Sequence, residues 1–375
     1  MKISSSKSSL LSGIQTVLRA LPSKSTMSIM ECILINTNGG KITLTVNNLD
    51  LGIETVIEGN IENAGVIALD AKHLSEIIRK MPDSASDIEI ETDDNYTTTI
   101  KCEQVKHTMP GRPDDEFPYI PDLDRDDSIV MSQLSLRELI RKTSFSIADI
   151  SEDTPGQQTM RGELMEIKDN SVKMCSLDGH RISMCKMDLR DSYPEKKVIV
   201  PGKSLKELAK IITGGAEDDV EIIFNPNHIS FEFGPTRVVS RIIEGNFFDV
   251  NKMLVGDYET KVKINKKRLT ECLDRSTIYV REGDKKPIVL DIKDDSISIK
   301  IISSSGNMNE EVPASKSGKD MIIGFNPRFV IDALNVIDDE EIELDFVNSK
   351  APCFIKKEDM SYLYVVLPVT ISGSV

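Results

Sequence analysis

The stretch Met174-Cys-Ser-Leu-Asp-Gly-His-Arg-Ile-Ser-Met184 contains two short apolar runs joined at Asp178-Gly179. Asp-Gly between strand-like runs predicts a tight turn, because glycine takes a positive φ without a steric penalty from Cβ. His180 and Arg181 follow at once, so two polar side chains emerge at the corner of a sheet. From these residues alone an ordinary hairpin is the simpler interpretation, since such turn chemistry is common.

Outward from this turn, a strand–turn–helix pattern is repeated along the chain. Apolar residues at helical spacing occur three times after a short strand-like opening, led by Leu10, Leu136 and Leu269. A second unit of the same kind also occurs three times, led by Leu74, Leu205 and Val330. The members of this second set are 131 and 125 residues apart, close to one third of the 375-residue chain. The sequence therefore predicts three copies of one domain, each with two strand–helix units.

The segments between the predicted helices alternate apolar and polar residues, as in Ser296-Ile-Ser-Ile-Lys-Ile301. Such period-two alternation is typical of half-buried strands. The predicted fold class is α+β, with three tandem copies of a domain in which two helices pack on antiparallel sheets. Polar breaks at 122–127 and 256–260 indicate domains of residues 1–126, 127–257 and 258–375.

The composition bounds the class of protein. A chain of 375 residues with 39% hydrophobic content is too long for one typical domain and can build sizeable cores. Its formal net charge of −15 favours solubility and, taken alone, argues against binding to nucleic acid.

The cysteines and histidines give no sign of a metal site. The six cysteines include no CxxC pair and the four histidines are scattered, so we expect no metal and no cofactor. Buried thiols in a reducing compartment are the simpler interpretation. The N-terminus lacks the apolar segment of a signal peptide, and no run approaches the roughly 18 apolar residues of a membrane span. We therefore expect a cytoplasmic protein without a membrane partner.

Positive charge is concentrated in the predicted helices. Together they carry nine more basic than acidic residues, which leaves −24 for the remainder of the chain; they are residues 8–21, 71–81, 135–142, 203–212, 266–275 and 328–337. Helix propensity alone does not explain this segregation, because Glu is as good a helix former as Lys. Basic helices within an acidic body suit a protein that surrounds a polyanion, whereas a set of solvated helix faces is the alternative interpretation.

Three motifs together resemble one family, the bacterial DNA polymerase III β subunits or β sliding clamps. They are Leu177-Asp-Gly-His-Arg-Ile182, Lys197-Val-Ile-Val-Pro201 and Tyr364-Val-Val-Leu-Pro-Val369, and the resemblance extends from Lys2 to Ile371. It implies a homodimeric ring in which twelve helices line a hole around double-stranded DNA. It also implies a non-catalytic processivity subunit that tethers the replicative polymerase and other replication and repair proteins.

The resemblance further implies sequence-independent contacts with the DNA backbone. The basic residues at matching positions are Lys24, Lys72, Arg79 and Lys203. Lys24 stands where the family often has Arg. A lysine offers a point charge, whereas an arginine offers a fork of two parallel hydrogen-bond donors. The loop Asp149–Thr159 usually supplies polar and aromatic contacts. Here it is acidic, with Gln157 and Gln158 as its neutral candidates, and Gln158 and Thr159 are assigned to the DNA-binding residues.

A partner-binding pocket is also implied by the resemblance. Its residues are Met160, Leu177, Gly179, His180, Arg181, Ile182, Phe248, Met253, Asn326, Val365, Val366, Leu367, Pro368 and Val369. The implied guest is a short clamp-binding motif resembling Gln-Leu-x-Leu-Phe, carried by polymerases and the clamp loader. Phe248 replaces a family Pro, Thr370 replaces an Arg, and residues 372–375 extend the usual end. Singly, each apolar member is better interpreted as core.

The dimer interface implied by the resemblance joins an edge of the first domain to an edge of the third. The first contributes Lys106 and His107, and the second contributes Ile278, Tyr279, Glu310 and Glu311. Two unpaired strand edges that meet can satisfy each other's backbone hydrogen bonds.

Two other function classes compete with a DNA clamp. An enzyme lacks support, because no Walker loop, GxSxG, HExxH or dinucleotide fingerprint occurs. The acidic pairs Asp114-Asp115 and Asp338-Asp339 could hold Mg²⁺, but such pairs in loops usually face solvent. A repeat scaffold that binds only proteins remains open from the residues alone.

Overall fold

The computed structural model describes residues 1–83, 86–149, 157–253, 257–280 and 287–371. The chain forms two compact units, one of residues 1–136 and 203–242 and the other of residues 137–202 and 243–375. Each unit is built on one antiparallel sheet that continues from one repeated domain into the next.

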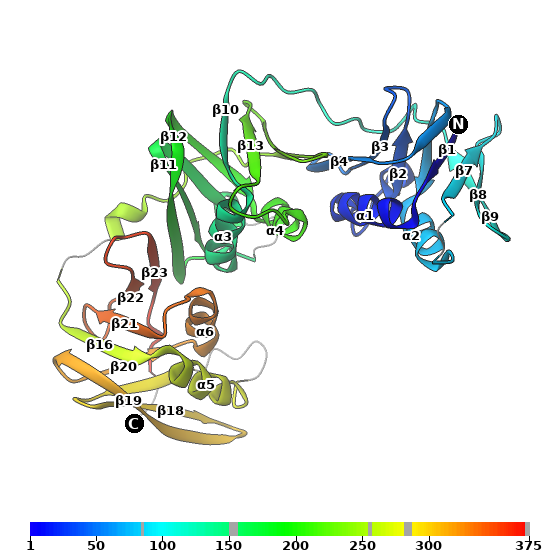
Figure 1. Cartoon of the computed structure of the whole chain (residues 1–375). Coiled ribbons are helices and arrows are strands. Elements are labelled where there is room, and N and C mark those ends of the chain that lie inside the picture. The colour runs from blue at the N-terminus through cyan, green and yellow to red at the C-terminus, as the bar shows by residue number, and fades with distance from the viewer. Residues whose placement is uncertain (84–85, 150–156, 254–256, 281–286, 372–375) are drawn as a thin grey trace. The chain divides into compact units, whose positions relative to one another are not determined.

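The first unit contains a sheet of thirteen strands within the described residues, in the order β10-β13-β14-β15-β4-β3-β2-β6-β9-β8-β7-β1-β5. Their bounds are β1 Lys2–Ser5, β2 Cys32–Asn36, β3 Ile42–Asn47, β4 Leu51–Ile57, β5 Asn60–Asn63, β6 Val66–Asp70, β7 Ile88–Thr92, β8 Thr97–Cys102, β9 Val105–Arg112, β10 Ser128–Ser132, β13 Asp219–Phe224, β14 His228–Phe233 and β15 Thr236–Arg241. The helices α1 (Lys7–Val17) and α2 (Ala71–Lys80) lie side by side (Figure 1).

The predicted helical spacing of the second repeat unit is realised in α2. Leu74, Ile77 and Ile78 are buried, which places one apolar stripe against the sheet. Asp70 caps the helix, since its side chain accepts a hydrogen bond from the backbone N–H of His73 at 2.7 Å. Strand β7 shows the predicted alternation, with Ile88 and Ile90 buried and Glu89 and Glu91 exposed.

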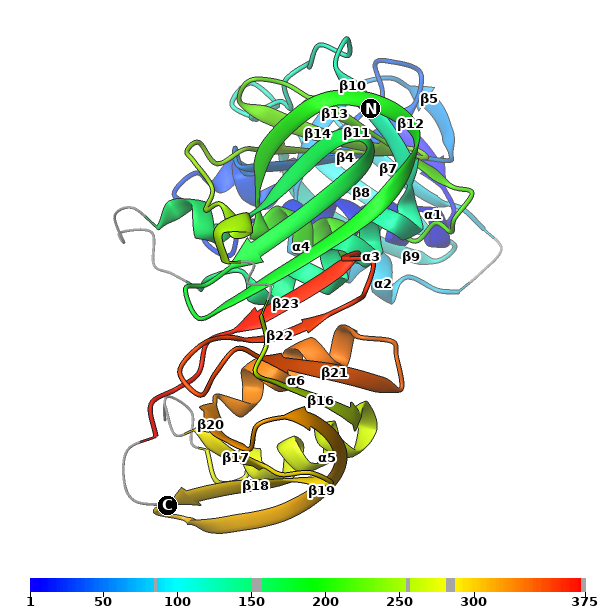
Figure 2. The same ribbon diagram turned by 90° about the vertical axis from the view of Figure 1, so that its left-hand side faces the viewer.

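The second unit contains a ten-stranded sheet within the described residues, in the order β11-β12-β23-β22-β21-β16-β19-β18-β17-β20. The bounds are β11 Gly162–Leu177, β12 Arg181–Pro201, β16 Thr260–Asn265, β17 Ile288–Ile292, β18 Ser296–Ser303, β19 Gly306–Gly318, β20 Met321–Phe325, β21 Glu341–Phe346, β22 Cys353–Lys356 and β23 Tyr362–Val366. Figure 2 shows the long ribbon of β11 and β12 with β23 running beside it.

The remaining helices match the predicted repeats. They are α3 (Gln133–Thr143), α4 (Gly202–Ile211), α5 (Lys266–Thr277) and α6 (Pro327–Val336), and α5 and α6 lie side by side in the second unit. The first predicted helix was expected to reach Leu21, but α1 ends at Val17 and continues as a 3₁₀ turn, η1 (Leu18–Ala20). Pro22 follows this turn, and the residue before a proline is disfavoured in the α region, which explains the early end.

All six cysteines are buried free thiols, as predicted. Burial raises the pKa of the Cys185 thiol to about 11, so it stays protonated at neutral pH. No helix of the described residues is long and apolar enough to span a membrane. The predicted α+β class, with helices on antiparallel sheets, is confirmed.

Candidate peptide groove, basic helices and open strand edges

The predicted turn is present between β11 and β12. Gly179 is exposed, has a φ of +86°, and would have no heavy atom within 4 Å of an added Cβ. The side chain of Asp178 accepts hydrogen bonds from the backbone N–H groups of His180 at 2.9 Å and Arg181 at 3.1 Å. The aspartate therefore closes the turn, and glycine supplies the backbone conformation that L-residues avoid.

An apolar cluster lies beside this turn, and we call it the groove cluster. Its buried members are Cys175, Leu177, Ile182, Met184, Val250, Phe354, Leu363 and Val365. Six half-buried apolar residues pack against it, namely Met160, Leu164, Phe247, Tyr258, Val347 and Met360. Four predicted pocket residues from distant parts of the chain, Met160, Leu177, Ile182 and Val365, thus lie in one cluster.

The burial of these residues divides the predicted pocket into a floor and a rim. Leu177, Ile182, Val365 and Val366 are at most 7% exposed, so their side chains are core. Leu367, Pro368 and Val369 are half-buried, and Phe248 is 44% exposed. A ligand can therefore reach Met160, Phe248 and the half-buried residues Leu367 to Val369, which we call the rim. The four buried residues form the floor beneath them.

The C-terminal segment is held to the turn by backbone hydrogen bonds. Strand β23 pairs with β12, with Ile182 opposite Val365. Beyond the strand, the N–H of Leu367 donates to the carbonyl of His180 at 2.8 Å, and that of Val369 donates to the carbonyl of Gly324 at 2.8 Å. The turn and the tail are therefore one structural element, as the resemblance implies.

Three predicted pocket residues have other or undescribed surroundings. The side chain of Asn326 caps α6 by accepting a hydrogen bond from the N–H of Arg328 at 3.0 Å, which accounts for its presence there. Met253 ends the 3₁₀ turn η5 (Val250–Met253), and its side chain lies outside the described residues. His180 is exposed and its ring stacks on Phe329, with the ring centroids 6.1 Å apart.

Arg181 is enclosed by protein groups. Its Nε donates to Asp178 at 2.9 Å, Nη1 to Asp332 at 2.6 Å, and Nη2 to the carbonyl of Phe145 at 2.7 Å. The guanidinium also lies 4.4 Å from the centre of the Phe329 ring, and the side chain is only 10% exposed. Burial opposes its charge, but the contacts with Asp332 and Asp178 outweigh burial and raise its pKa. Each of the three guanidinium nitrogens donates a hydrogen bond within the protein, so the Arg181 side chain is held in one position beside the groove.

The predicted DNA-contacting cations are accessible. Lys24, Lys72 and Lys203 are exposed, and none has an ion-pair partner among the described residues. Arg79 is 61% exposed and binds both carboxylate oxygens of Glu76 at 2.6 Å, and these hydrogen bonds lower the pKa of Glu76. These four cations belong to the first unit.

The predicted acidic loop is only partly described, because residues 150–156 lie outside the described residues. Gln158 and Thr159 lie in the 3₁₀ turn η4 (Gln158–Arg161), where Gln158 is exposed and Thr159 half-buried. They belong to the second unit, so they are described apart from the four cations.

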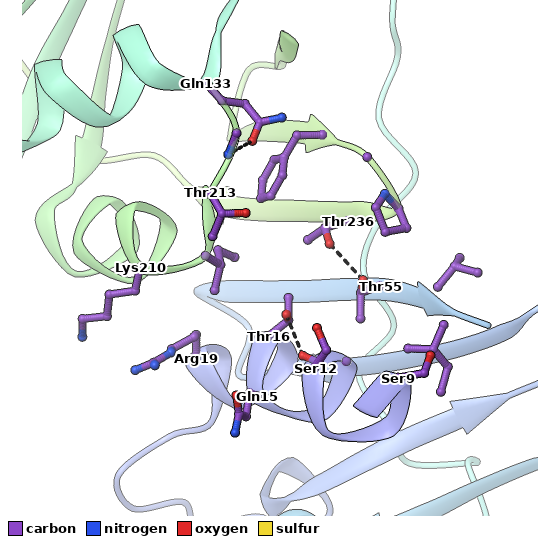
Figure 3. Close-up of a pocket in the computed structure, with 18 of the residues that line it drawn as sticks. Ser9, Ser12, Gln15, Thr16, Arg19, Thr55, Gln133, Lys210, Thr213 and Thr236 are labelled. Carbon is purple, nitrogen blue, oxygen red and sulfur yellow. Dashed lines mark hydrogen bonds between the residues drawn. The ribbon is translucent and has the colours of Figure 1, made fainter. Parts of the chain in front are cut away.

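A cleft in the first unit gives a contrast to these exposed cations (Figure 3). It has a volume of about 740 Å³, and a hydrogen bond of 2.9 Å between the hydroxyls of Thr55 and Thr236 lies at its wall. Four charged side chains line it and balance one another: Arg19, Lys210, Glu58 and Asp218. Glu207 lies 3.8 Å from Arg19 and 2.7 Å from Lys210. These cations are thus already paired, and the cleft has no excess of positive charge that would attract a phosphate.

Strands β4 and β12 occupy the same place in successive repeats, and each pairs with the last strand of the next repeat. Strand β4 pairs with β15 from Thr55–Thr236 to Leu51–Ser240, and β12 pairs with β23 from Arg181–Val366 to Cys185–Tyr362. Strand β19 occupies this place in the third repeat. Among the described residues, however, its residues 306–313 pair only with β18 and leave their other edge open. Likewise, β9, the last strand of the first repeat, pairs over residues 105–110 only with β8.

The predicted interface residues lie at these two edges. Lys106 and His107 are exposed on β9, and Glu310 and Glu311 lie on β19. Near β19, the side chain of Ile278 is 75% exposed in the single chain. Glu310 accepts from Arg275 at 2.9 Å, and this contact lowers the pKa of Glu310.

Comparison with known proteins places this architecture. Models of the DNA polymerase III beta subunit match the chain in three parts, the N-terminal domain at residues 1–121, the central domain at 130–249 and the C-terminal domain at 252–370. The Staphylococcus aureus beta sliding clamp is 30% identical over 367 residues, which is 95% of this chain and 96% of that protein.

Solved structures agree with the sequence relatives. A DNA polymerase III beta subunit structure from Eubacterium rectale superposes with a TM-score of 0.93 at 50% identity, covering 99% of this chain and 100% of that one. The DNA polymerase sliding clamp of Bacillus subtilis superposes with a TM-score of 0.92 at 28% identity, covering 99% of each chain.

Three tandem domains with helices on antiparallel sheets, joined strand to strand, define a DNA clamp. The chain belongs to the DNA polymerase III β-subunit family. It is a DNA sliding clamp of DNA polymerase III, a processivity subunit that is not itself catalytic.

Proposed function

We propose that two copies of this chain close into a ring around double-stranded DNA, with β9 of one copy added to the open edge of β19 of the other. The observation that carries this proposal is the interrupted series of joints. Two joints within the chain, β4 with β15 and β12 with β23, use the same pair of repeat positions. The third member of the series needs a strand from outside the chain, and an unpaired edge favours such addition.

The solution mass tests the dimer. Light scattering at micromolar concentration should give twice the chain mass of 41.7 kDa. The double variant Ile278→Asp with Tyr279→Asp should give monomers, because Ile278 is 75% exposed in the single chain and both new carboxylates would be buried in the dimer. Leu49→Asp, at a 54% exposed leucine of the first unit, is the matched control and should remain a dimer. A monomer of wild type at every concentration would rule out the ring.

The proposed hold on DNA is topological and aided by weak phosphate contacts. Lys24, Lys72, Arg79 and Lys203 are the proposed backbone contacts, with Gln158 and Thr159 as neutral ones. Exposed lysines without carboxylate partners among the described residues suit this role. They can contact the phosphates of any DNA sequence, and each contact releases counterions from the DNA. A ring loaded on nicked circular DNA should be lost when the circle is linearised, and retention on the linear product would contradict the topological hold.

The rim of the groove cluster is the proposed docking site for short motifs of the replicative polymerase, the clamp loader and other clamp-binding proteins. Its half-buried apolar residues, Met160 and Leu367 to Val369, offer accessible apolar surface above a fixed floor. Such surface is typical of partner sites. Binding of a labelled Gln-Leu-x-Leu-Phe peptide, measured by fluorescence anisotropy and lost in Leu367→Asp, is the test. The proposed location of such a ring is the cytoplasm, where it would act on chromosomal DNA.

A further inference from the structure

The Arg181 side chain ends on a helix that lies 151 positions away in the sequence. Its Nη1 donates to the carboxylate of Asp332 on α6 at 2.6 Å. The partner Asp178 belongs to the turn itself, so Asp332 is the carboxylate that joins the turn to α6. The Asp332 side chain is 39% exposed, whereas that of Arg181 is 10% exposed. The hydrogen bond therefore joins a buried guanidinium to a carboxylate that is partly exposed on α6.

The same region is held together by aromatic contacts. Phe329, also on α6, lies under the guanidinium of Arg181 at 4.4 Å and beside the ring of His180. The hydroxyl of Tyr364 in β23 donates to the carbonyl of Phe329 at 2.7 Å. The turn, the tail strand and α6 thus share one set of contacts, and the rim residue Leu367 is bonded to the same turn.

Asp332 also decides the charge of α6. The helix contains one basic residue, Arg328, and one acidic residue, Asp332, so its net charge is zero. The helices α2, α3, α4 and α5 each carry a net charge of two positive units. On α6, the carboxylate of Asp332 thus cancels the positive charge that the other four helices carry. The same carboxylate accepts a hydrogen bond from Arg181.

We propose that Asp332 is a positioning residue for the groove, which fixes Arg181 and, through it, the turn and tail in the form that accepts a peptide. This inference rests on the proposed function of the groove rim. The same carboxylate reduces the attraction of α6 for DNA. Asp332 thereby affects both binding surfaces: it favours peptide binding at the groove and weakens the attraction of α6 for DNA.

Asp332→Asn tests the link because it keeps the shape of the side chain and removes its charge. The guanidinium loses a charge-assisted partner in a site where such bonds are strong, so the turn should open more often. We expect peptide affinity to fall about tenfold, with hydrogen exchange of the amides of residues 178–181 accelerated. Association with DNA at low salt should become stronger, because α6 gains one unit of positive charge.

The control variants separate this role from general destabilisation. Asp332→Glu retains the carboxylate and should recover most of the peptide affinity, whereas Arg181→Lys should lose it, since an ammonium group cannot meet three partners in the geometry of a guanidinium. Arg328→Gln changes the charge of the same helix at an exposed position, and its peptide affinity should equal that of wild type. Thermal unfolding of each variant verifies that the fold is retained.

The outcomes distinguish the inference from the function on which it rests. If Leu367→Asp abolishes peptide binding while Asp332→Asn binds as wild type does, the positioning role is wrong and the groove stands. If Leu367→Asp binds equally well, the groove assignment is wrong, and the positioning role falls with it. Loss of peptide affinity in Asp332→Asn with recovery in Asp332→Glu and stronger DNA association supports the link.

Discussion

Arg79 and Arg181 are each paired with a carboxylate three residues earlier in the chain, yet they differ in what they can do. Arg79 binds Glu76 on the surface of α2 and is 61% exposed. Arg181 binds Asp178 beside the groove and is 10% exposed, with Asp332 and the carbonyl of Phe145 completing its surroundings. The exposed pair leaves a cation that a phosphate can attract, whereas the buried arginine is part of the scaffold. Burial, not residue type, decides the role.

The same contrast separates the two proposed binding surfaces. The groove rim offers apolar side chains above a buried floor, so its affinity should come from shape and desolvation. The basic helices offer exposed cations, so their affinity should come from counterion release. Four changes sharpen or break this contrast, and they follow from the largest expected effect to the smallest.

Leu367→Asp should have the largest effect. A charge placed in the apolar rim must be desolvated when the peptide docks, and the expected loss of affinity exceeds a hundredfold. Fluorescence anisotropy with a labelled peptide measures it, and sedimentation of the variant verifies the dimer mass. The dependence of DNA association on salt should be unchanged in this variant, because Leu367 carries no charge and is not among the proposed phosphate contacts; a changed dependence would mean that Leu367 also affects the DNA-facing surface.

Replacing each arginine by glutamine should lower the free energy of unfolding by very different amounts at the two pairs. Arg181→Gln leaves two carboxylates without their cation, and breaking a buried pair costs about 3–5 kcal/mol. Arg79→Gln removes an exposed pair between neighbouring turns, which is screened by solvent and should change the free energy of unfolding little. Urea unfolding of both variants gives the two free energies. Equal losses would show that Arg181 is not the scaffold element described here.

The triple variant Lys24→Ala, Lys72→Ala and Arg79→Ala should weaken DNA association and flatten its dependence on salt. Each lost phosphate contact lowers the slope of log K against log salt by about 0.9. The measurement is association with short linear duplexes over a range of salt concentrations. Peptide affinity should stay at the wild-type value, and an unchanged slope would remove these residues from the DNA-facing surface.

A pH titration should give the smallest effect, at Glu166 in the β11–β12 ribbon. Burial raises the pKa of this carboxyl, but hydrogen bonds from Lys173 and Lys197 outweigh burial and lower it below its usual 4.5. A lowered pKa means that the folded state favours the ionised form, so this stabilisation is present above pH 4.5 and is lost as the pH falls through the folded-state pKa. Glu166→Gln should melt about 2–4 °C below wild type at pH 7. The difference should shrink as the pH falls below 4.5 and disappear once the pH lies below the folded-state pKa, and a constant difference would contradict the assignment.

The repeated elements could be predicted from the sequence because they depend on local periodicity. The helices led by Leu74, Leu205 and Val330 occur where their apolar spacing places them, and the Asp178-Gly179 turn occurs where glycine is required. The assembly of Met160, Leu177 and Val365 into one cluster followed from the family resemblance, since no local pattern connects them.

The partners of the charged residues could not be predicted. Arg181 and Asp332 are 151 positions apart, and Arg19 meets Glu207 across an equally non-local contact. Counting charges along a helix treats all of them as available, whereas a tertiary contact with Glu207 pairs Arg19 and leaves Lys203 exposed. The capping role of Asn326 has a sequence signal, an Asn directly before the Pro-initiated helix, which the pocket assignment overlooked.

The series of strand joints has a consequence for the lifetime of the proposed ring. In the joints of β4 with β15 and β12 with β23, both strands belong to one chain, so a separated pair is held at high effective concentration and closes again. The joint of β19 with β9 lacks this covalent link, and a ring of two copies contains it twice. Opening one such seam lets the DNA leave while the other seam still joins the two copies. The residence time on a closed DNA circle is therefore the opening time of one seam, and it should be shorter than the time needed for the dimer to dissociate.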